Sequence, residues 1–283
     1  MTYTEKLLHS VRASRSTLCV GLDPDPEKIP SPLKSQFPDP CDLVFEFCRR
    51  VIESTKMDAA AYKPNIAFFE ALGPEGWQVL HSLTDLIPGG KVIVADAKRG
   101  DIGTTAEKYR TAFFDHLAAD AITLNPLMGL ETLDPFLVNE AKAVYALAMT
   151  SNTGAADFLQ LSFHGRNSLG EYISEQLAKK QADCPAQIGM VVGATTTAEK
   201  LLPVLDAFPS APLLIPGIGA QGGDPDVLKT TLSRHTGIPL VNSSRAILYA
   251  GGDRENWEEL VAVKASETRV LLEPITQKFL PKE

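Results

Sequence analysis

Charged side chains follow a short apolar run near the middle of the chain, in the stretch VIVADAKRGDIGTT at residues 92–105. Residues 92–95 are β-branched or small, which predicts a buried strand, and Asp96, Lys98 and Asp101 come directly after it. Asp96 and Lys98 lie two residues apart and therefore project to the same side of a strand, while Gly100 allows a turn that brings Asp101 back toward them. A lysine between two carboxylates can stabilise developing negative charge and deliver a proton. The alternative interpretation is a solvated strand end with a surface ion pair.

The composition is that of a globular chain with an acidic balance. Its 283 residues are 44% hydrophobic and 22% charged, enough for one large barrel or two ordinary domains. The formal net charge of -8 argues against a nucleic acid or an anionic membrane as the main partner. An anionic ligand would have to be met by a local group of cations.

The cysteines give no sign of a metal or redox site. Cys19, Cys41, Cys48 and Cys184 form no CxxC pair and no cluster with the five histidines. This cysteine usage fits a reducing cytoplasm best. The first residues carry charges throughout without an apolar run of signal-peptide length, and no later segment is apolar for long enough to span a membrane. We therefore expect a cytoplasmic protein with no membrane partner.

Short apolar strands alternate with helical stretches along the whole chain. The strands are expected at residues 17–22, 59–62, 92–95, 121–124, 143–149, 187–192, 212–215 and 239–241. Helices are expected at residues 4–13, 43–55, 66–72, 76–86, 105–117, 131–139, 169–180, 196–207 and 224–233, with a last one after residues 251–252. This alternation predicts an α/β fold, a single-domain (β/α)8 TIM barrel over residues 1–283, with a doubly wound sheet as the alternative. The long polar loop at residues 153–168 is expected to be a functional lid.

Chemically capable residues recur after these predicted strands. In a (β/α)8 barrel the functional groups cluster at the carboxyl ends of the strands. The residues expected there are Asp23, Lys63, Asp96, Lys98, Asp101, Asn125, Ser151, the segment 217–221, Ser244 and Arg245. Their collection at one end of the barrel favours a functional site over scattered surface charge.

The glycine-rich segment GIGAQG at residues 217–222 matches the GxGxxG pattern of dinucleotide-binding folds. It follows the seventh predicted strand instead of the first, and Asn242 stands where that fold needs an acidic residue. Loops after strands seven and eight of a barrel commonly bind phosphate through backbone N–H groups, and Arg245 would add a forked cation. We favour a phosphate site over a plain glycine turn.

Several blocks together resemble one known family. DAKRGDIGTT is similar to the Asp-x-Lys-x-x-Asp motif of orotidine 5'-phosphate decarboxylase, and VGLDPDP, AYKPNIAFFEALGPEG, PGIGAQGGD and NSSRAILYA resemble its other blocks in their usual order. The resemblance spans nearly the whole chain and is greatest to the longer bacterial subgroup of the family.

The resemblance implies decarboxylation of orotidine 5'-monophosphate to UMP and carbon dioxide, the last step of UMP synthesis, without a metal or other cofactor. Lys98 would deliver a proton to C6 of the pyrimidine, and Asp96 would lie beside the substrate carboxylate. Asp101, Ile102 and Thr105 would be contributed to the site of the neighbouring subunit, which makes the active unit a homodimer.

The same resemblance implies the remaining contacts with the substrate. Lys63 and Asp23 would contact the ribose and complete the charge array, and Ser151 would bind the edge of the pyrimidine. Pro216 and Ile102 would provide apolar walls for the base. The phosphate would be held by Gln221 and Arg245 beside the backbone at Gly217, Gly219 and Ser244.

Two alternatives remain open. One is a phosphosugar enzyme of the same superfamily, such as a hexulose-phosphate synthase or a keto-gulonate-phosphate decarboxylase. Such an enzyme would need Mg²⁺ and an extra acidic ligand where this chain has Lys63. The other is a non-catalytic barrel that binds a nucleotide phosphate through Gln221 and Arg245.

Overall fold

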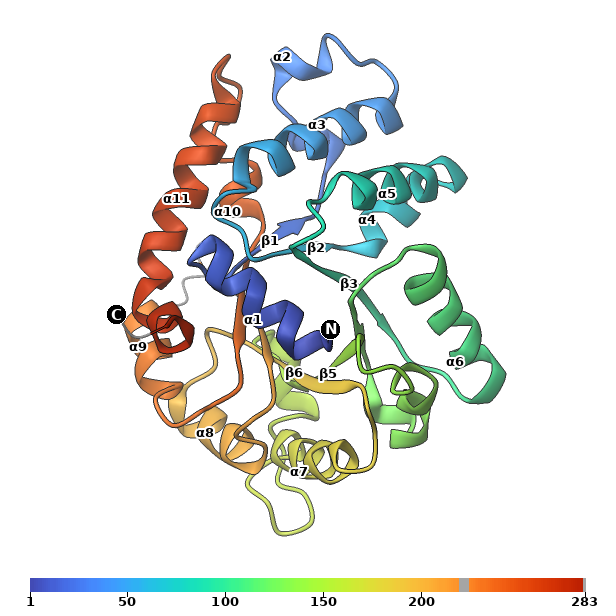
Figure 1. Ribbon diagram of the computed structural model, residues 1–283, viewed down its shortest axis with the longest axis vertical. Helices are drawn as coiled ribbons and strands as arrows, with labels where there is room; N and C mark the ends of the chain where they lie inside the picture. The colour runs from blue at the N-terminus through green and yellow to red at the C-terminus, as the bar shows by residue number, and fades with distance from the viewer. Residues whose placement is uncertain (219–223, 282–283) are drawn as a thin grey trace.

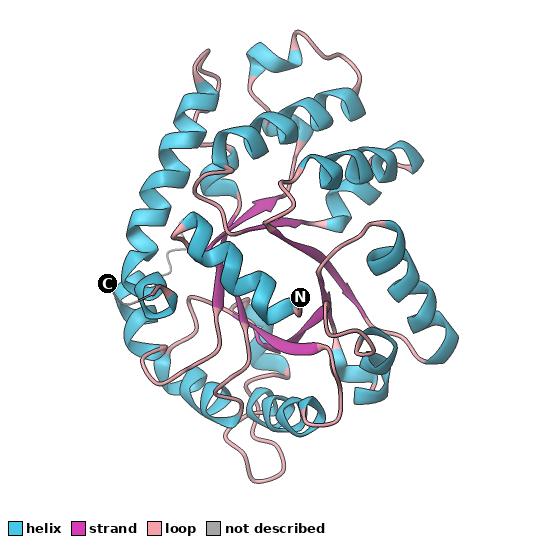
Figure 2. Cartoon of the chain, in the orientation of Figure 1, coloured by secondary structure: helices cyan, strands magenta, loops and turns pink. Residues whose placement is uncertain are grey.

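Eight parallel strands close into a barrel in the order in which they occur along the chain (Figure 2). The computed structural model describes residues 1–218 and 224–281. The strands are β1 (Leu18–Leu22), β2 (Ala61–Pro64), β3 (Val92–Arg99), β4 (Ala121–Leu124), β5 (Ala143–Met149), β6 (Gln187–Val192), β7 (Leu213–Pro216) and β8 (Pro239–Ser243). The pairing of β1 with β8 completes the ring, which confirms the predicted TIM barrel over a doubly wound sheet.

Helices surround the barrel and connect its strands (Figure 1). The α-helices are α1 (Tyr3–Ser14), α2 (Ser31–Lys34), α3 (Pro40–Thr55), α4 (Ile66–Glu70), α5 (Pro74–Leu86), α6 (Gly103–Arg110), α7 (Leu169–Gln181), α8 (Ala198–Ala207), α9 (Pro225–Thr231), α10 (Arg245–Leu248) and α11 (Trp257–Thr276). Shorter 3-10 turns are η1 (Pro26–Lys28), η3 (Pro126–Met128), η4 (Leu130–Phe136), η5 (Thr153–Asp157) and η6 (Gln277–Phe279), and η2 (Thr111–His116) is a π-helix. Among the described residues, no helix has the length and apolarity that a membrane span requires.

Side chains alternate along each strand between the barrel interior and the helical layer. In β3, Val92 and Val94 pack inside the barrel, whereas Ile93 and Ala95 pack outward against the helices. Successive side chains of a strand point to opposite faces, so the next inward position is Asp96. The alternation therefore carries the chain from an apolar barrel floor to a charged position near the carboxyl end of β3.

Helix α1 covers the amino-terminal end of the barrel, where Figure 1 shows it crossing in front of the strands. Its Tyr3 and Leu7 are buried against the interior residues. The Ser10 hydroxyl donates to the carbonyl of Ala60 at 2.6 Å, just before β2 begins. The hydroxyls of Tyr3 and Tyr145 lie 2.8 Å apart inside the barrel. Those predicted site residues that the structure describes lie at the opposite end, where the strands terminate.

The crossover from β4 to β5 departs from the prediction. An α-helix was expected at residues 131–139, but the chain forms the 3-10 helix η4, which contains Pro135. Proline lacks the N–H that an α-helix interior needs and clashes with the preceding turn, so a 3-10 helix forms here instead of an α-helix. The predicted helix at residues 105–117 is similarly divided, because α6 passes into the π-helix η2 at Thr111.

The long loop after β5 is more structured than the prediction of a plain loop. Residues Thr153–Asp157 form η5, and Phe163 pairs with Arg166 in an isolated antiparallel bridge. The rings of Phe163 and Tyr172 lie 5.0 Å apart, which ties the loop to α7. Closure of this loop over a ligand stays a prediction.

Candidate active site

Asp96 is the centre of a charge array at the mouth of the barrel. The Nζ atom of Lys63, on the neighbouring strand β2, lies 2.6 Å from its Oδ2 atom. The Nζ atom of Lys98 contacts its Oδ1 atom. The Lys63 and Asp96 side chains are 4% and 10% exposed, whereas that of Lys98 is 50% exposed. One buried carboxylate is therefore shared between a buried ammonium and an ammonium that reaches solvent.

An irregularity in β3 shapes this array. The β3–β4 register runs from Ala95 opposite Ile122 directly to Arg99 opposite Leu124, so the ladder is interrupted between them. Within the interruption, Lys98 has a φ of 47°, in the left-handed region that non-glycine residues seldom adopt. Sequence reasoning ended the strand at residue 95, but it continues through this irregularity to Arg99.

Sequence reasoning missed Thr123 of β4, which contacts both Asp96 and Lys98 of β3. Its hydroxyl accepts a hydrogen bond from the Lys98 backbone N–H at 2.9 Å and donates to Asp96 Oδ1 at 3.0 Å. Thr123 is two residues from Ala121, which faces the barrel interior. A polar residue at an inward position of an otherwise apolar strand was the available signal.

The two buried groups keep each other charged. Burial disfavours the ionised form of Asp96, but Lys63 and Lys98 outweigh burial and hold the pKa of that carboxyl well below its usual range. Burial also disfavours the charged form of Lys63, but the nearby carboxylates of Asp96 and Asp23 raise its pKa above the ordinary lysine value. Asp96 and Lys63 are therefore persistent charges near neutral pH.

Asp23 lies beside this array, directly after β1. Its backbone carbonyl accepts a hydrogen bond from the Tyr249 hydroxyl at 3.0 Å, which fixes the start of the loop. Its Oδ1 atom is buried and has no hydrogen-bond partner in the structure. Buried carboxylate oxygens normally have partners, so Asp23 is placed to accept a bond from a ligand hydroxyl.

Asp101 does not join the array within this chain, in contrast to the expected return toward Lys98. Its carboxylate accepts a hydrogen bond from the N–H of Ile102 at 2.8 Å, and it forms no ion pair with the described residues. Gly100 serves a close approach, because a Cβ atom there would lie 2.7 Å from the carbonyl oxygen of Asn125. Ile102 and Thr105 are also exposed.

The predicted base contact Ser151 lies just beyond β5 and packs closely against the loop that follows β6. A Cβ atom on Gly193 would come within 2.4 Å of the Ser151 Cβ, so only glycine permits this approach. The N–H of Ala194 then donates to the carbonyl of Pro216 at 2.9 Å. Ser151 and Pro216 are thus connected through residues 193 and 194.

The predicted phosphate residues lie partly within the described structure. Pro216 ends β7, and Gly217 has a φ of 111°, a conformation that requires glycine. Gly219 and Gln221 lie outside the described residues. Arg245 is exposed at the start of α10, next to Ser244.

Asn242, on the inner side of β8, is a second residue to which sequence reasoning gave no role at the site. Its Nδ2 atom donates to Ser244 Oγ at 3.1 Å, and its Oδ1 atom is buried without a partner. A Cβ atom on Gly21 would lie only 1.8 Å from Ser244 Oγ, so the glycine in β1 makes room for Ser244. Sequence reasoning ended β8 at residue 241, whereas it continues through Ser243.

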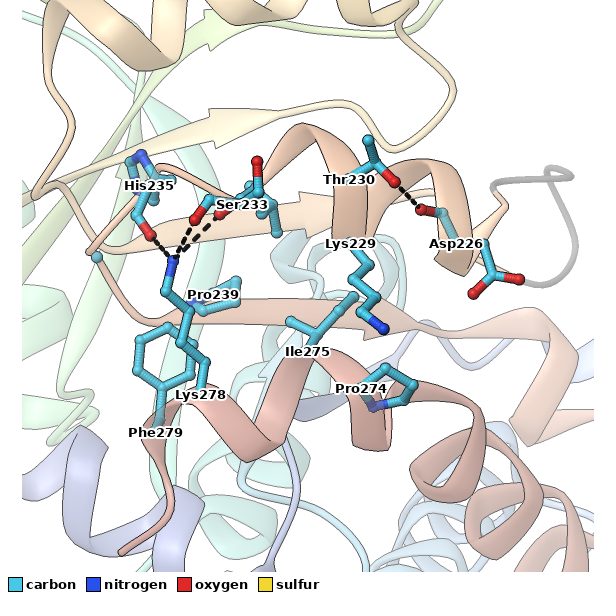
Figure 3. A pocket seen from close by; sticks show the side chains of 12 residues that line it. Asp226, Lys229, Thr230, Ser233, His235, Pro239, Pro274, Ile275, Lys278 and Phe279 are labelled. Carbon is cyan, nitrogen blue, oxygen red and sulfur yellow. Dashed lines mark hydrogen bonds between the residues drawn. The ribbon is translucent and has the colours of Figure 1, made fainter. Parts of the chain in front are cut away.

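A cavity of about 500 Å³ lies elsewhere, between α9 and the end of α11 (Figure 3). It is lined in part by Pro239, the first residue of β8, and therefore lies toward the opposite end of that strand from the charge array. In Figure 3 the amino group of Lys278 points at backbone carbonyls, including that of Ser233 at 3.1 Å. None of the predicted site residues within the described ranges lines this cavity. No three histidine, cysteine, aspartate or glutamate side chains within residues 1–218 and 224–281 converge as metal ligands.

A closed parallel barrel with two lysines on one buried aspartate at the carboxyl ends of its strands is the architecture of a (β/α)8 barrel enzyme. The sequence profile of the orotidine 5'-phosphate decarboxylase / HUMPS family matches residues 16–260. The chain therefore belongs to this family, which confirms the resemblance seen in its sequence blocks.

Individual relatives agree with that assignment. A protein of Dechloromonas aromatica named orotidine 5'-phosphate decarboxylase is 42% identical over 273 residues, which cover 95% of this chain and 97% of the relative. A protein of the same name from Herpetosiphon aurantiacus is 40% identical over 250 residues, or 88% of this chain and 90% of the relative. The solved structure of Leishmania donovani OMP decarboxylase superposes with a TM-score of 0.80 at 36% identity, covering 98% of this chain and 99% of the other.

Proposed function

We propose that this chain decarboxylates orotidine 5'-monophosphate to UMP and carbon dioxide, the last step of UMP synthesis, with Lys98 as the proton donor. The observation that carries the proposal is the array itself. In a chain of this family, Lys98 reaches solvent from the mouth of the barrel while its ammonium contacts the buried Asp96. The scheme requires no metal or organic cofactor.

The chemistry follows from the charges. When the bond between C6 and the carboxylate breaks, carbon dioxide leaves and the electron pair stays on C6 as a vinylic carbanion. The Lys98 ammonium stabilises that negative charge and then transfers one proton from Nζ to C6. This step leaves Lys98 neutral, and its half-exposed side chain regains a proton from solvent.

The buried pair sets the electrostatics around the reacting carbon. Asp96 remains ionised beside Lys63 and would face the substrate carboxylate, which it repels until carbon dioxide departs. Contacts remote from the reacting carbon supply the binding energy that holds this arrangement together. Asp23, through its unpartnered Oδ1, and Lys63 would bind the ribose hydroxyls.

We assign the rest of the substrate to the far side of the barrel mouth. Ser151 and Pro216 would contact the pyrimidine, and they are linked through residues 193 and 194. Arg245 and the backbone near Gly217 and Ser244 would hold the phosphate. Gly219 and Gln221 complete this phosphate site by their match to the family blocks.

The active unit in this proposal is a homodimer in which Asp101 completes the array of the neighbouring subunit. Asp101 has no ionic partner among the described residues of its own chain. Apolar side chains are exposed on the segments that follow β3 and β4: Ile102 is 55%, Leu127 58% and Met128 56% exposed. Such apolar exposure is typical of an interface between subunits. Ile102 and Thr105 would enter the partner's site with Asp101.

We also place the protein in the cytoplasm. Its four cysteines are free thiols, including the buried Cys19 and Cys48. Free thiols are the usual state in a reducing compartment.

The phosphosugar alternative fits the site less well. A Mg²⁺ site would need an acidic ligand at the position of Lys63, whose ammonium lies 2.6 Å from Asp96. A divalent cation there would have to displace a buried ion pair. The non-catalytic alternative accounts for a phosphate site but gives no role to the lysine pair on Asp96.

Substitution of Lys98 tests the proposed chemistry. Lys98→Ala removes the proton donor and should lower kcat by at least about 100-fold. General acid catalysis usually contributes about 100-fold to 10,000-fold. Lys98→Arg keeps the positive charge, but a guanidinium is too weak an acid to release its proton to C6, so this variant should also be inactive. Binding of UMP, measured by calorimetry, should change little in both variants. Wild-type turnover in Lys98→Ala would contradict the proposal.

A further inference from the structure

Thr123 is the single residue of β4 that stands opposite the interruption in β3. The register pairs Ala95 with Ile122 and then Arg99 with Leu124, so three residues of β3 face one residue of β4. Those three are Asp96, Ala97 and Lys98. In an interrupted ladder, backbone groups lose their regular partners and must find others.

The Thr123 hydroxyl is one of those partners, and it also contacts the charge array. It accepts from the Lys98 backbone N–H at 2.9 Å, and this bond replaces the missing ladder hydrogen bond. It donates its own proton to Asp96 Oδ1 at 3.0 Å, the same oxygen that the Lys98 ammonium contacts. A hydroxyl has one donor and two lone pairs, so both bonds can be made at once.

This double contact fixes the backbone conformation of Lys98 and the plane of the Asp96 carboxylate. Lys98 is held with a φ of 47°, which is unfavourable for a lysine and persists only if the surroundings enforce it. Asp96 needs a fixed carboxylate plane to place one oxygen on Lys63 and the other on Lys98. Thr123 is 1% exposed, so its hydroxyl is shielded from bulk solvent.

We propose that Thr123 is a positioning residue for decarboxylation, whose hydroxyl sets the backbone of Lys98 and the carboxylate of Asp96 in the geometry for proton transfer. The inference rests on the proposed roles of Asp96 and Lys98. Thr123 does not touch the substrate in this scheme. Its effect is on the chemical step, because a small displacement of a catalytic group lowers its rate more than it lowers binding.

Two substitutions separate the hydroxyl from the rest of the side chain. Thr123→Val keeps the shape and removes the hydroxyl, and we expect kcat for orotidine 5'-monophosphate to fall by about 100-fold, as for a catalytic group misplaced by about 1 Å. KM and the affinity for UMP should change little. Thr123→Ser keeps the hydroxyl and should recover most of the lost kcat.

A matched control comes from α3. The Thr55 hydroxyl is also buried with two partners, as it donates to the Val51 carbonyl at 2.8 Å and lies 2.9 Å from the Tyr62 hydroxyl. Thr55→Val should lower the melting temperature while kcat stays at the wild-type value. Equal loss of kcat in Thr55→Val and Thr123→Val would overturn the inference, because general destabilisation would then explain the effect of Thr123→Val.

Other results separate this inference from the proposed function. Wild-type kcat in Thr123→Val, or a Thr123→Ser variant as impaired as Thr123→Val, would overturn the role of the hydroxyl. If Lys98→Ala is inactive in the same assays, the proposed function stands and the positioning role alone fails. If Lys98→Ala is active, the proposed function fails and the role of Thr123 fails with it.

Discussion

Asp96 is ionised in a place where burial alone would favour the neutral carboxylic acid. Its 10% exposed side chain keeps its charge because Lys63 and Lys98 contact one oxygen each. Buried ion pairs are weak contributors to stability when intact, but removing one partner leaves the other charge without compensation. At the scale of single residues, the array therefore couples the chemistry of this site to the stability of the barrel.

Asp96→Asn should destabilise the protein because it leaves the buried Lys63 ammonium without its nearest counter-ion. The expected loss is about 3 kcal/mol of unfolding free energy at pH 7, measured by urea denaturation. Asp206→Asn is the matched control, since Asp206 pairs with Arg234 at 3.0 Å on the surface, with side chains 53% and 71% exposed. That exposed pair should cost about 0–1 kcal/mol. Equal losses in the two variants would contradict the account of the array.

The same comparison has a defined pH dependence. The folded pKa of Asp96 is lowered, so its stabilising effect is present above the ordinary carboxyl pKa of about 3.9 and is lost as pH falls through the folded value. The folded pKa of Lys63 is raised, so its effect is present below about 10.4 and is lost as pH rises through the folded value. The stability gap between wild type and Asp96→Asn should therefore be flat from about pH 5 to 9 and narrow below about pH 4.

At the scale of elements, strand positions were predictable, and the bounds of β4, β5 and β6 are those predicted, whereas β2, β3, β7 and β8 extend past their predicted carboxyl ends. All eight predicted strands exist, because apolar runs between helical stretches are a strong local signal. Lys63, Asp96 and Asn242 lie within their strands, whereas sequence reasoning placed them after the strands ended. Charge usually marks the end of a buried strand, but here the charged residues face the barrel mouth and pair with one another.

The geometry of Lys98 could not be predicted from β3 alone. Its left-handed backbone depends on a hydroxyl from β4, and the contact is defined only when the two strands pair. The role of Thr123 was missed for the same reason, because β4 by itself shows only one polar residue at an inward position. Gly219 and Gln221 keep the roles that the family resemblance gives them, as predictions.

Helix α1 gives a prediction at this scale, because it seals the barrel through a buried pair of tyrosines. Burial raises the pKa of Tyr3 and of Tyr145, so both hydroxyls stay protonated and depend on each other for a hydrogen bond. Tyr3→Phe should cost about 1–3 kcal/mol of unfolding free energy, because the Tyr145 hydroxyl is left buried and unpaired. The double variant Tyr3→Phe/Tyr145→Phe should recover part of that loss. Single costs that add in the double variant would show that the hydroxyls are not coupled.

At the scale of the whole molecule, the proposed dimer explains why Asp101 does not join the charge array of its own chain. Asp101 belongs to the family motif but lies outside the array of its own chain, and Ile102 beside it is 55% exposed. The sequence resemblance implied this division, but spacing alone suggested the opposite, a return of Asp101 toward Lys98. A segment that serves another subunit cannot be recognised from local pattern, because its partner residues are not on the same chain.

Mixing two inactive variants tests the shared site. Lys98→Ala and Asp101→Ala each lack one residue that every site of the respective homodimer needs. A mixed dimer contains one site with both native residues, so random exchange at equal concentrations should restore about one quarter of wild-type activity. Exchange is verified independently with subunits of different mass. Complete exchange without recovered activity would argue against the shared site.

The most direct measurement is the turnover of orotidine 5'-monophosphate by the purified wild-type protein, followed spectrophotometrically with and without EDTA. Lys98, held on a buried carboxylate, supplies both the stabilising charge and the proton, so we predict conversion to UMP at the same rate in both conditions. Two results would contradict the assignment of the chemistry to the lysine–aspartate array. One is no turnover both with and without EDTA, and the other is turnover that EDTA abolishes and Mg²⁺ restores.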